Sequence, residues 1–239
     1  MLLSLAVAPV FIVLFYTYIR DKYEKEPIRL LVVGVTFGAI ITFPIVLVGN
    51  VALIFLPLNV TIRQDAMFNA FIVAAFVEEI FKYIVLFFLT WENRNLNEKF
   101  DGIVYGVFIS LGFAFVENIL FVFSEDMGGV TTALSRAIIS VPGHGLFGIY
   151  MGYYFTIAKF GTLDYKNYKH GKVSKKHKSL YLTVAFLLPW LLHGAFNFFI
   201  LSGSHVLLFL LFVILLWQGG FIKMHNHIKN SPFKANSKR

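Results

Sequence analysis

Residues 66–90 read AMFNAFIVAAFVEEIFKYIVLFFLT. The run is apolar over the length that an α-helix needs to cross a bilayer, roughly 20 residues. It nevertheless contains Glu78, Glu79 and Lys82. An ionisable side chain deep in a span costs about 2.5–3.5 kcal/mol even on the mildest insertion scale, so such residues are usually paired or functional. The segment therefore predicts a transmembrane helix that carries polar chemistry.

Composition extends the membrane interpretation to the whole chain. Apolar residues make up 58% of the sequence and charged residues only 14%, whereas soluble domains contain about 25% charged residues. The 28 phenylalanines exceed what a soluble core of this length needs, and lipid-facing surface accounts for them. The absence of cysteine excludes disulfides and cysteine-ligated zinc. Residues 1–19 lack the features of a cleaved signal, so we expect a retained first helix.

Apolar segments of spanning length recur along the chain. We expect one all-α transmembrane bundle with about seven spans, which cover residues 2–19, 28–55, 66–90, 102–123, 131–158, 180–201 and 206–222. Pro44 is expected to kink the second span, and Pro142 to break or bend the fifth. Backbone groups freed there must be satisfied by protein or water, so Pro142 indicates a polar interior.

The positions of the basic residues predict the orientation of the bundle. Seven spans place the connecting loops alternately on two sides of the membrane. Nearly all Lys and Arg residues fall on one side, in residues 20–29, 91–101, 159–178 and the C-terminal tail, and the other side has only Arg63. The positive-inside rule then places the N-terminus outside and the C-terminus in the cytoplasm.

The net charge of +8 raises the question of an anionic partner. We interpret the basic loop 166–178 as a solvated cytoplasmic surface near anionic lipid. A nucleic-acid partner is not expected, because no aromatic stacking platform accompanies the charges.

The paired glutamates of the third span can both reach Lys82. Glu78 lies four residues before Lys82 and Glu79 three residues before it, the spacings at which side chains meet on a helix surface. Adjacent helix positions differ by about 100°, so one carboxylate can serve chemistry while the other pairs with the lysine. A purely structural ion pair is the alternative, but a second carboxylate argues against it.

Three later spans carry further polar residues. Glu117 has no basic neighbour within its own span, so its partner must come from another helix, a water or a metal. His144 lies between two glycines that let a backbone or ligand approach closely. His193 and Asn197 are four residues apart and share one helix face. At about 1.5 Å per residue, most of these groups fall in the outer half of the bilayer, which predicts one polar site open to the outside.

Carboxylates, imidazoles and an amide around one cavity suit the activation of water. A glutamate can act as a general base on water and then as an acid toward the leaving amine, while His193 with Asn197 can stabilise an oxyanion. Zinc held by His144, His193 and either Glu79 or Glu117 is the alternative, although no HExxH motif is present. No Gly-x-Ser-x-Gly motif for a serine nucleophile is present either.

The ordered set of motifs resembles the PrsW family of bacterial intramembrane proteases. The match is carried by Glu24-Lys25-Glu26-Pro27, Glu78-Glu79-x-x-Lys82, Phe113-x-x-x-Glu117-Asn118 and His193-x-x-x-Asn197, with His144 after Pro142. Each motif is weak alone, but their order is fairly specific and covers nearly the whole chain. The resemblance implies a multi-pass endopeptidase of the bacterial cell membrane. It also implies that the enzyme makes the first, extracytoplasmic cut in a single-span anti-sigma factor during a stress response.

The resemblance also implies roles for individual residues. Either Glu78 or Glu79 activates water, and His193 with Asn197 binds the oxyanion. Glu117 and His144 complete the site, and two further residues support it, Lys82 and Asn118.

Other functions remain as alternatives. The family is remotely similar to CAAX prenyl endopeptidases and Abi proteins, which have Glu-Glu-x-x-x-Arg and an additional histidine. Here Lys82 is one position nearer and Glu117 stands for that histidine, which argues against a prenyl-protein substrate. A proton- or ion-coupled transporter also uses intramembrane carboxylates, but would favour broken helices in two matching halves. A non-catalytic scaffold for a single-span partner is the third alternative.

Overall fold

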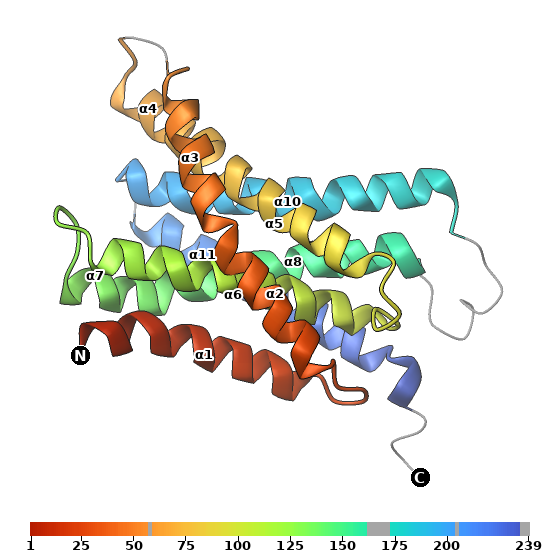
Figure 1. The fold of residues 1–239 in the computed structure, drawn as a ribbon. Coiled ribbons are helices and arrows are strands. Elements are labelled where there is room, and N and C mark those ends of the chain that lie inside the picture. The colour runs from red at the N-terminus through yellow and green to blue at the C-terminus, as the bar shows by residue number, and fades with distance from the viewer. Residues whose placement is uncertain (57–58, 162–172, 204–205, 235–239) are drawn as a thin grey trace.

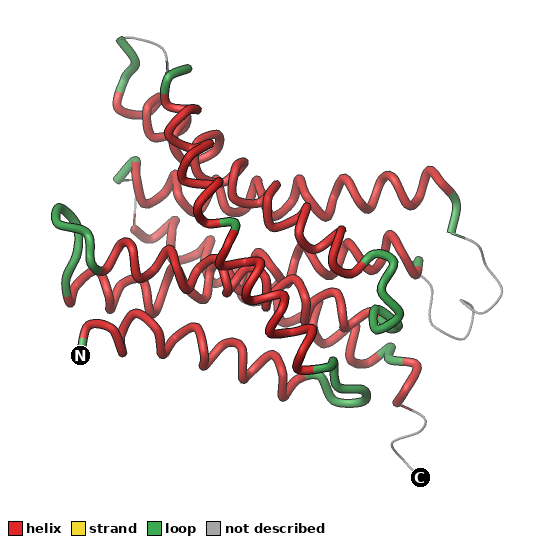
Figure 2. Tube along the Cα trace, viewed as in Figure 1, coloured by secondary structure: helices red, strands yellow, loops and turns green. Residues whose placement is uncertain are grey.

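The computed structural model describes residues 1–56, 59–161, 173–203 and 206–234, and these ranges contain helices and loops but no strand (Figures 1 and 2). The α-helices are α1 (Leu2–Arg20), α2 (Ile28–Ile40), α3 (Thr42–Leu53), α4 (Ile62–Phe68), α5 (Val77–Thr90), α6 (Lys99–Val122), α7 (Val130–Ser135), α8 (Val141–Phe160), α10 (Lys175–Leu201) and α11 (Val206–Lys229). Two π-helical segments complete the set, η1 (Asn69–Phe76) and η2 (Arg136–Ser140).

Membrane-length helices dominate the described residues. Five are long and apolar enough to cross a bilayer: α1, the combined α2 and α3, α6, α10 and α11. Two further helical runs, 62–90 and 130–160, are each divided by a π-helical segment. The all-helical membrane architecture is therefore confirmed, while the count of seven spans and the orientation of the termini stay predictions.

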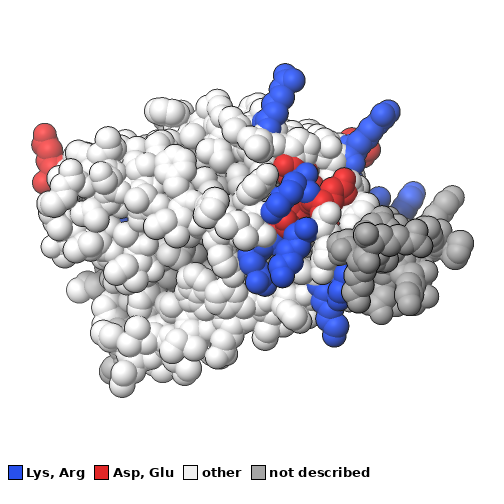
Figure 3. All heavy atoms as spheres, turned by 90° about the horizontal axis from the view of Figure 1, so that it is seen from below, with Lys and Arg blue, Asp and Glu red and all other residues white. Residues whose placement is uncertain are grey.

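The connections between helices gather at two ends of the bundle. In Figure 1 the N-terminus and the α6–α7 turn lie at one end, and the α1–α2 and α5–α6 loops lie at the other. Lys and Arg side chains collect toward this second end on the face drawn in Figure 3. We call it the basic end. Part of the predicted basic loop, residues 162–172, lies outside the described residues.

The two prolines act differently. α2 ends at Ile40 and α3 begins at Thr42, so the predicted kink in the second segment is confirmed. Its cause is Pro44, which has no N–H for the carbonyl of Ile40 and whose ring clashes with that carbonyl. Pro142 is the second residue of α8 and follows the π-helical η2 closely, so the fifth segment changes from π-helix to α-helix at the proline instead of breaking there.

The centre of the bundle is a close contact between α6 and α8. A Cβ atom at Gly148 would lie 2.6 Å from the carbonyl oxygen of Gly106, and one at Gly106 would lie 2.5 Å from the carbonyl oxygen of Gly148. Small residues let transmembrane helices approach to backbone contact in this way. The contact sets α8 against α6, the helices that carry His144 and Glu117.

We expect Gly148→Ala to destabilise the protein by about 1–3 kcal/mol, because the added methyl must displace the backbone of α6. Thermal unfolding in detergent measures the effect. Gly34→Ala is the matched control, since its Cβ would meet only side-chain carbons at ordinary contact distance, the nearest on Ile109 at 3.6 Å. The control should be neutral or stabilising, because alanine is the better helix former. Equal unfolding temperatures for the two variants would contradict the close contact.

Candidate functional site

The π-helical segments directly precede the helices that carry the polar residues. η1 ends at Phe76, before the glutamates of α5, and η2 ends at Ser140, before His144 of α8. A π-helical turn leaves backbone groups outside the regular α-helical ladder. The carbonyl of Phe71 in η1 accepts a hydrogen bond of 2.7 Å from Nε1 of Trp190 in α10. This hydrogen bond joins α10 to η1, the segment that leads directly into α5.

Glu78, Glu79, His144 and His193 come together in the interior of the bundle, and we call them the buried group. Lys82 lies at the centre of this group and is fully buried. Its Nζ donates to Glu78 Oε2 at 3.2 Å and to Glu79 Oε1 at 2.8 Å. The same ammonium lies 3.2 Å from His144 Nδ1 and 4.3 Å from the ring centroid of Phe113. The prediction that both glutamates reach Lys82 is confirmed. The two side chains converge on one ammonium although their backbone positions point in different directions.

His193 joins α10 to the glutamates of α5. Its Nδ1 lies 2.9 Å from Glu79 Oε1, and its Nε2 lies 3.2 Å from Asn197 Nδ2. The imidazole stacks on the ring of Phe147 with a centroid distance of 4.6 Å. The shared face predicted for His193 and Asn197 is confirmed, and both ring nitrogens have partners that fix the orientation of the ring.

Glu117 bonds the far side of His144. Its Oε2 accepts from Arg136 at 2.5 Å and lies 3.0 Å from His144 Nε2. The Lys82 ammonium, which lies 3.2 Å from His144 Nδ1, can only donate. His144 Nδ1 therefore accepts from Lys82, and the Nε2–H of the same ring donates to Glu117. The partner that the sequence required from another helix is Arg136, which lies in η2.

Arg136 belongs to this network although it was not among the predicted site residues. Its Nε donates to Asn118 Oδ1 at 2.7 Å, and Asn118 Nδ2 in turn donates to the carbonyl of Ala6 in α1 at 2.6 Å. Asn118 therefore supports the network from outside the buried group. The sequence does contain a signal for this residue. Arg136 lies about as far from the predicted outer end of its span as Glu117 lies from that of its own span, so the two are expected at similar depth in the membrane.

Four residues of the group could hold a metal ion. Glu78, Glu79, His144 and His193 each offer one ligand atom, and these atoms lie within 4.8 Å of one another. Carboxylate oxygens and imidazole nitrogens are ligands that zinc accepts. Glu79 Oε2 is buried and has no hydrogen-bond partner among the described residues, so it could bind a cation. The donor set therefore fits a divalent metal, provided that the Lys82 ammonium withdraws from between the ligands.

The composition of this set differs from the predicted one in one residue. The sequence offered Glu117 as an alternative ligand, whereas the structure brings Glu78 into the set. Glu117 contacts Nε2 of His144, while Nδ1 of the same ring faces Lys82. Glu117 therefore fixes the orientation of the His144 imidazole through the ring nitrogen that faces away from Lys82.

The motif at residues 24–27 lies elsewhere, in the loop between α1 and α2 at the basic end. Glu26 is buried, accepts from the hydroxyl of Tyr105, and donates its backbone N–H to Asp21 Oδ2 at 3.2 Å. Burial raises the pKa of Asp21 to about 6 and that of Glu26 to about 7. These contacts fasten the loop to α6, so this motif has a structural explanation apart from the buried group.

The arrangement can support hydrolysis. Carboxylates, imidazoles and an ammonium from different helices meet in an apolar surrounding, where electrostatic interactions are stronger than in water. A group of this composition can take a proton from water, hold a developing negative charge and return the proton.

Comparisons with known proteins agree with the motifs. The family described as PrsW family intramembrane metalloprotease matches residues 26–218. The chain is 39% identical to Protease PrsW of Oceanobacillus iheyensis over 90% of this chain and 91% of the relative. It is 35% identical to Protease PrsW of Geobacillus kaustophilus, over 93% and 90% of the two chains. It is 30% identical to Protease PrsW of Bacillus subtilis, over 93% of each chain.

No solved structure matches the chain. The family match covers most of the sequence and includes all the residues of the buried group. The helices are those of a multi-pass membrane protein. The chain therefore belongs to the PrsW family of intramembrane metalloproteases and is a membrane-embedded peptidase.

Proposed function

We propose that this chain makes the first, extracytoplasmic cut in a single-span anti-sigma factor as part of a stress response. The observation that carries the proposal is the buried group formed by Glu78, Glu79, His144 and His193. Such a group suits water attack on a peptide bond, and the family supplies the protein substrate class. The depth of the polar residues, counted from the predicted outer ends of the spans, supports a cut on the extracytoplasmic side.

Glu78 is our choice for the base that takes the proton from water. Glu79 already accepts from both Lys82 and His193, whereas Glu78 accepts one hydrogen bond, from Lys82. Its contacts with His193 and His144 are longer, at 3.9 and 4.0 Å. Glu78 also keeps a small exposed fraction of 6%, while Glu79 has none. A base must meet water to remove its proton, which favours Glu78. Glu79 then orients His193 and the lysine.

His193 and Asn197 are proposed to bind the oxyanion of the tetrahedral intermediate. Their mutual contact of 3.2 Å and the bond from His193 to Glu79 hold both groups in one orientation before substrate arrives. Asn197 Nδ2 donates one hydrogen to His193 Nε2 and keeps a second for the oxyanion, while His193 holds the amide in place. A preorganised donor contributes strongly because it needs no reorganisation during the reaction. His144, oriented by Glu117, completes the site.

Zinc is the alternative to this metal-free mechanism, and Glu78, Glu79, His144 and His193 would hold it. Bound there, it would supply Lewis-acid polarisation of a peptide carbonyl or a water. In a metal-free mechanism Glu78 activates the water, and the Lys82 ammonium provides the positive charge beside it. Both mechanisms use the same buried residues of this chain.

The proposed orientation places the basic end in the cytoplasm. There its lysines and arginines would meet the anionic lipid of the inner leaflet, which attracts basic segments. We propose no nucleic-acid partner. The location that follows is the bacterial cell membrane, and the curated relatives come from bacteria.

Co-expression with candidate single-span anti-sigma factors tests the proposal. We expect a fragment whose new terminus lies just outside the membrane on the extracytoplasmic side, identified by immunoblot and mass spectrometry. The matched control is a chimera in which the juxtamembrane segment comes from an unrelated single-span protein, and this chimera should stay intact. Cleavage on the cytoplasmic side, or equal cleavage of the chimera, would contradict the proposed substrate and side.

A further inference from the structure

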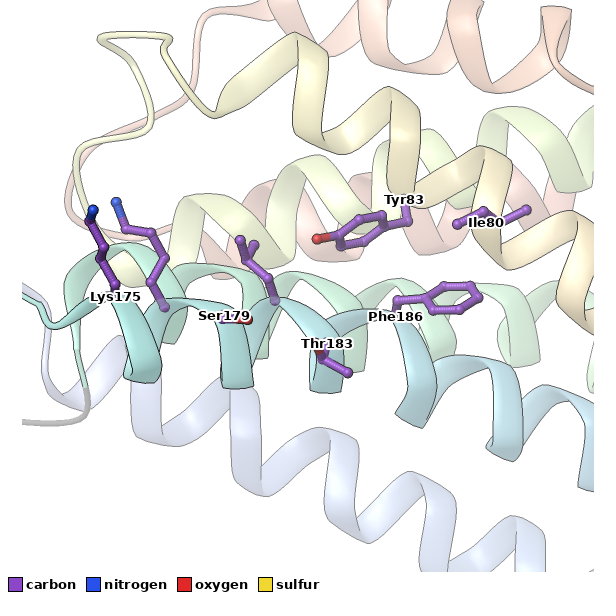
Figure 4. A pocket seen from close by; sticks show the side chains of 8 residues that line it. Ile80, Tyr83, Lys175, Ser179, Thr183 and Phe186 are labelled. Carbon is purple, nitrogen blue, oxygen red and sulfur yellow. The ribbon is translucent and has the colours of Figure 1, made fainter.

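A groove of about 520 Å³ lies between α5 and α10, away from the buried group. Figure 4 shows Ile80 and Tyr83 on α5 across from Phe186 on α10, with Lys175 at the other end of the groove. The mechanism proposed above uses none of these side chains.

The groove changes character along its length. Its lining on α10 begins with Lys175, Lys178 and Ser179, which are exposed, and continues with Leu182 and Phe186. Positions three and four apart share one face of a helix, so these residues form a single stripe along α10. One end of the stripe is cationic and hydrogen-bonding, and the rest is largely apolar. A ligand that fits must have an anionic head and an apolar tail.

The length of the stripe agrees with one leaflet of a bilayer. From Lys175 to Phe186 it measures about 16 Å at 1.5 Å per residue, and half of the hydrocarbon core measures about 15 Å. An acyl chain that begins at the lysines would therefore end near Phe186. A protein segment crossing the membrane has no reason to stop at that depth.

The cationic end has the features of a headgroup site. Lys178 lies 5.2 Å and Lys159 lies 5.8 Å from the ring centroid of Trp91, so two ammonium groups approach the same indole. Tryptophan is enriched at the membrane interface. Lys175 is the first residue of α10, and the N-terminus of a helix favours an anion. Basic pockets between transmembrane helices on the cytoplasmic side bind anionic lipid headgroups.

The geometry points to a binding site for one anionic glycerophospholipid, with its phosphate at Lys175 and Lys178 and an acyl chain along the groove toward Phe186. This inference rests on the proposed orientation, which places the basic end in the cytoplasmic leaflet, but not on proteolysis. The lipid would lie between the two helices that are joined by the 2.9 Å contact of Glu79 and His193. Occupancy of the groove would therefore support the spacing of the helix pair that builds the site.

Lipid binding to the full-length protein in neutral detergent tests the inference without any substrate. Native mass spectrometry counts bound phosphatidylglycerol, phosphatidylcholine with the same chains, and glycerol phosphate without chains. We expect one tightly bound phosphatidylglycerol and weaker binding of the other two probes. Lys175→Gln with Lys178→Gln should weaken phosphatidylglycerol binding about tenfold or more, and Thr183→Trp should weaken it by filling the groove.

The matched control removes the same charge elsewhere, by Lys22→Gln with Lys176→Gln, because neither of these exposed lysines lines the groove. It should bind phosphatidylglycerol like the unchanged protein. Equal loss in control and test variants would overturn the inference, as would equal binding of phosphatidylcholine or of glycerol phosphate. A separate cleavage assay of Thr183→Trp adds one outcome: unchanged lipid binding with reduced cleavage would assign the groove to the protein substrate instead. Because binding is measured without cleavage, failure here leaves the proposed function untouched.

Discussion

Replacing Glu78 with glutamine should reduce peptide cleavage by about 10²–10⁴-fold, the range that a positioned general base contributes. The amide is nearly the same size and can still accept a hydrogen bond from Lys82, but it cannot take a proton from water. The buried group should stay folded, because Glu79 keeps its bonds to Lys82 and His193. Cleavage of a single-span substrate, measured together with thermal unfolding in detergent, separates the two effects.

Glu79→Gln should differ from Glu78→Gln in its effect on stability. Glu79 is fully buried and accepts from two side chains, so its loss should lower both activity and unfolding temperature. His193→Ala should also abolish cleavage, because it removes the side chain that holds the Asn197 amide in place for the oxyanion. Glu125→Gln, in the exposed turn between α6 and α7, is the control and should change neither quantity. Full activity of the Glu78 variant would assign the proton transfer to another residue.

Much of the fold could be predicted from the sequence because lipid imposes a simple rule. A helix must satisfy its own backbone in the bilayer, so long apolar runs mark the helices with little ambiguity. α1 and α11 begin where the apolar runs begin, at Leu2 and Val206. The π-helical segments could not be predicted, because they arise from contacts such as that of Trp190 with Phe71. The runs they interrupt still have the expected extent.

The buried group was predictable as a set, because each member is costly in lipid and needs a partner. How the members pair was less accessible. The spacing predicted that both glutamates can reach Lys82, but also that one of them would be left for chemistry while the other pairs with the lysine. In the structure both bond the same ammonium. Glu117 was predicted as a possible metal ligand, but the structure has Glu78 in that set. The reason is that Nδ1 of His144 faces Lys82 and the other ligands, while Nε2 faces Glu117. Only the packing of α8 against α6 determines that.

Lys82→Met should lower the free energy of unfolding by about 3–5 kcal/mol, because it leaves buried carboxylates without their cation. The ammonium lies 2.8–3.2 Å from Glu78, Glu79 and His144, which are three of the four possible metal ligands. Two cations at this spacing repel, so Lys82 and a metal compete for one position. We therefore expect Zn²⁺ or Co²⁺ to raise the unfolding temperature of the variant more than that of the unchanged protein.

The competition between Lys82 and a metal can be separated from a general loss of stability. Lys159→Met is the matched control, because this partly buried lysine bonds the carbonyl of Trp91 and lies outside the metal-ligand set. Its response to Zn²⁺ or Co²⁺ should equal that of the unchanged protein. Visible absorption of bound Co²⁺ gives a second readout and should appear at lower concentration in Lys82→Met. Equal metal affinity with and without Lys82 would mean that the ammonium and the metal occupy different positions, so that the lysine pairs the glutamates while the metal is bound.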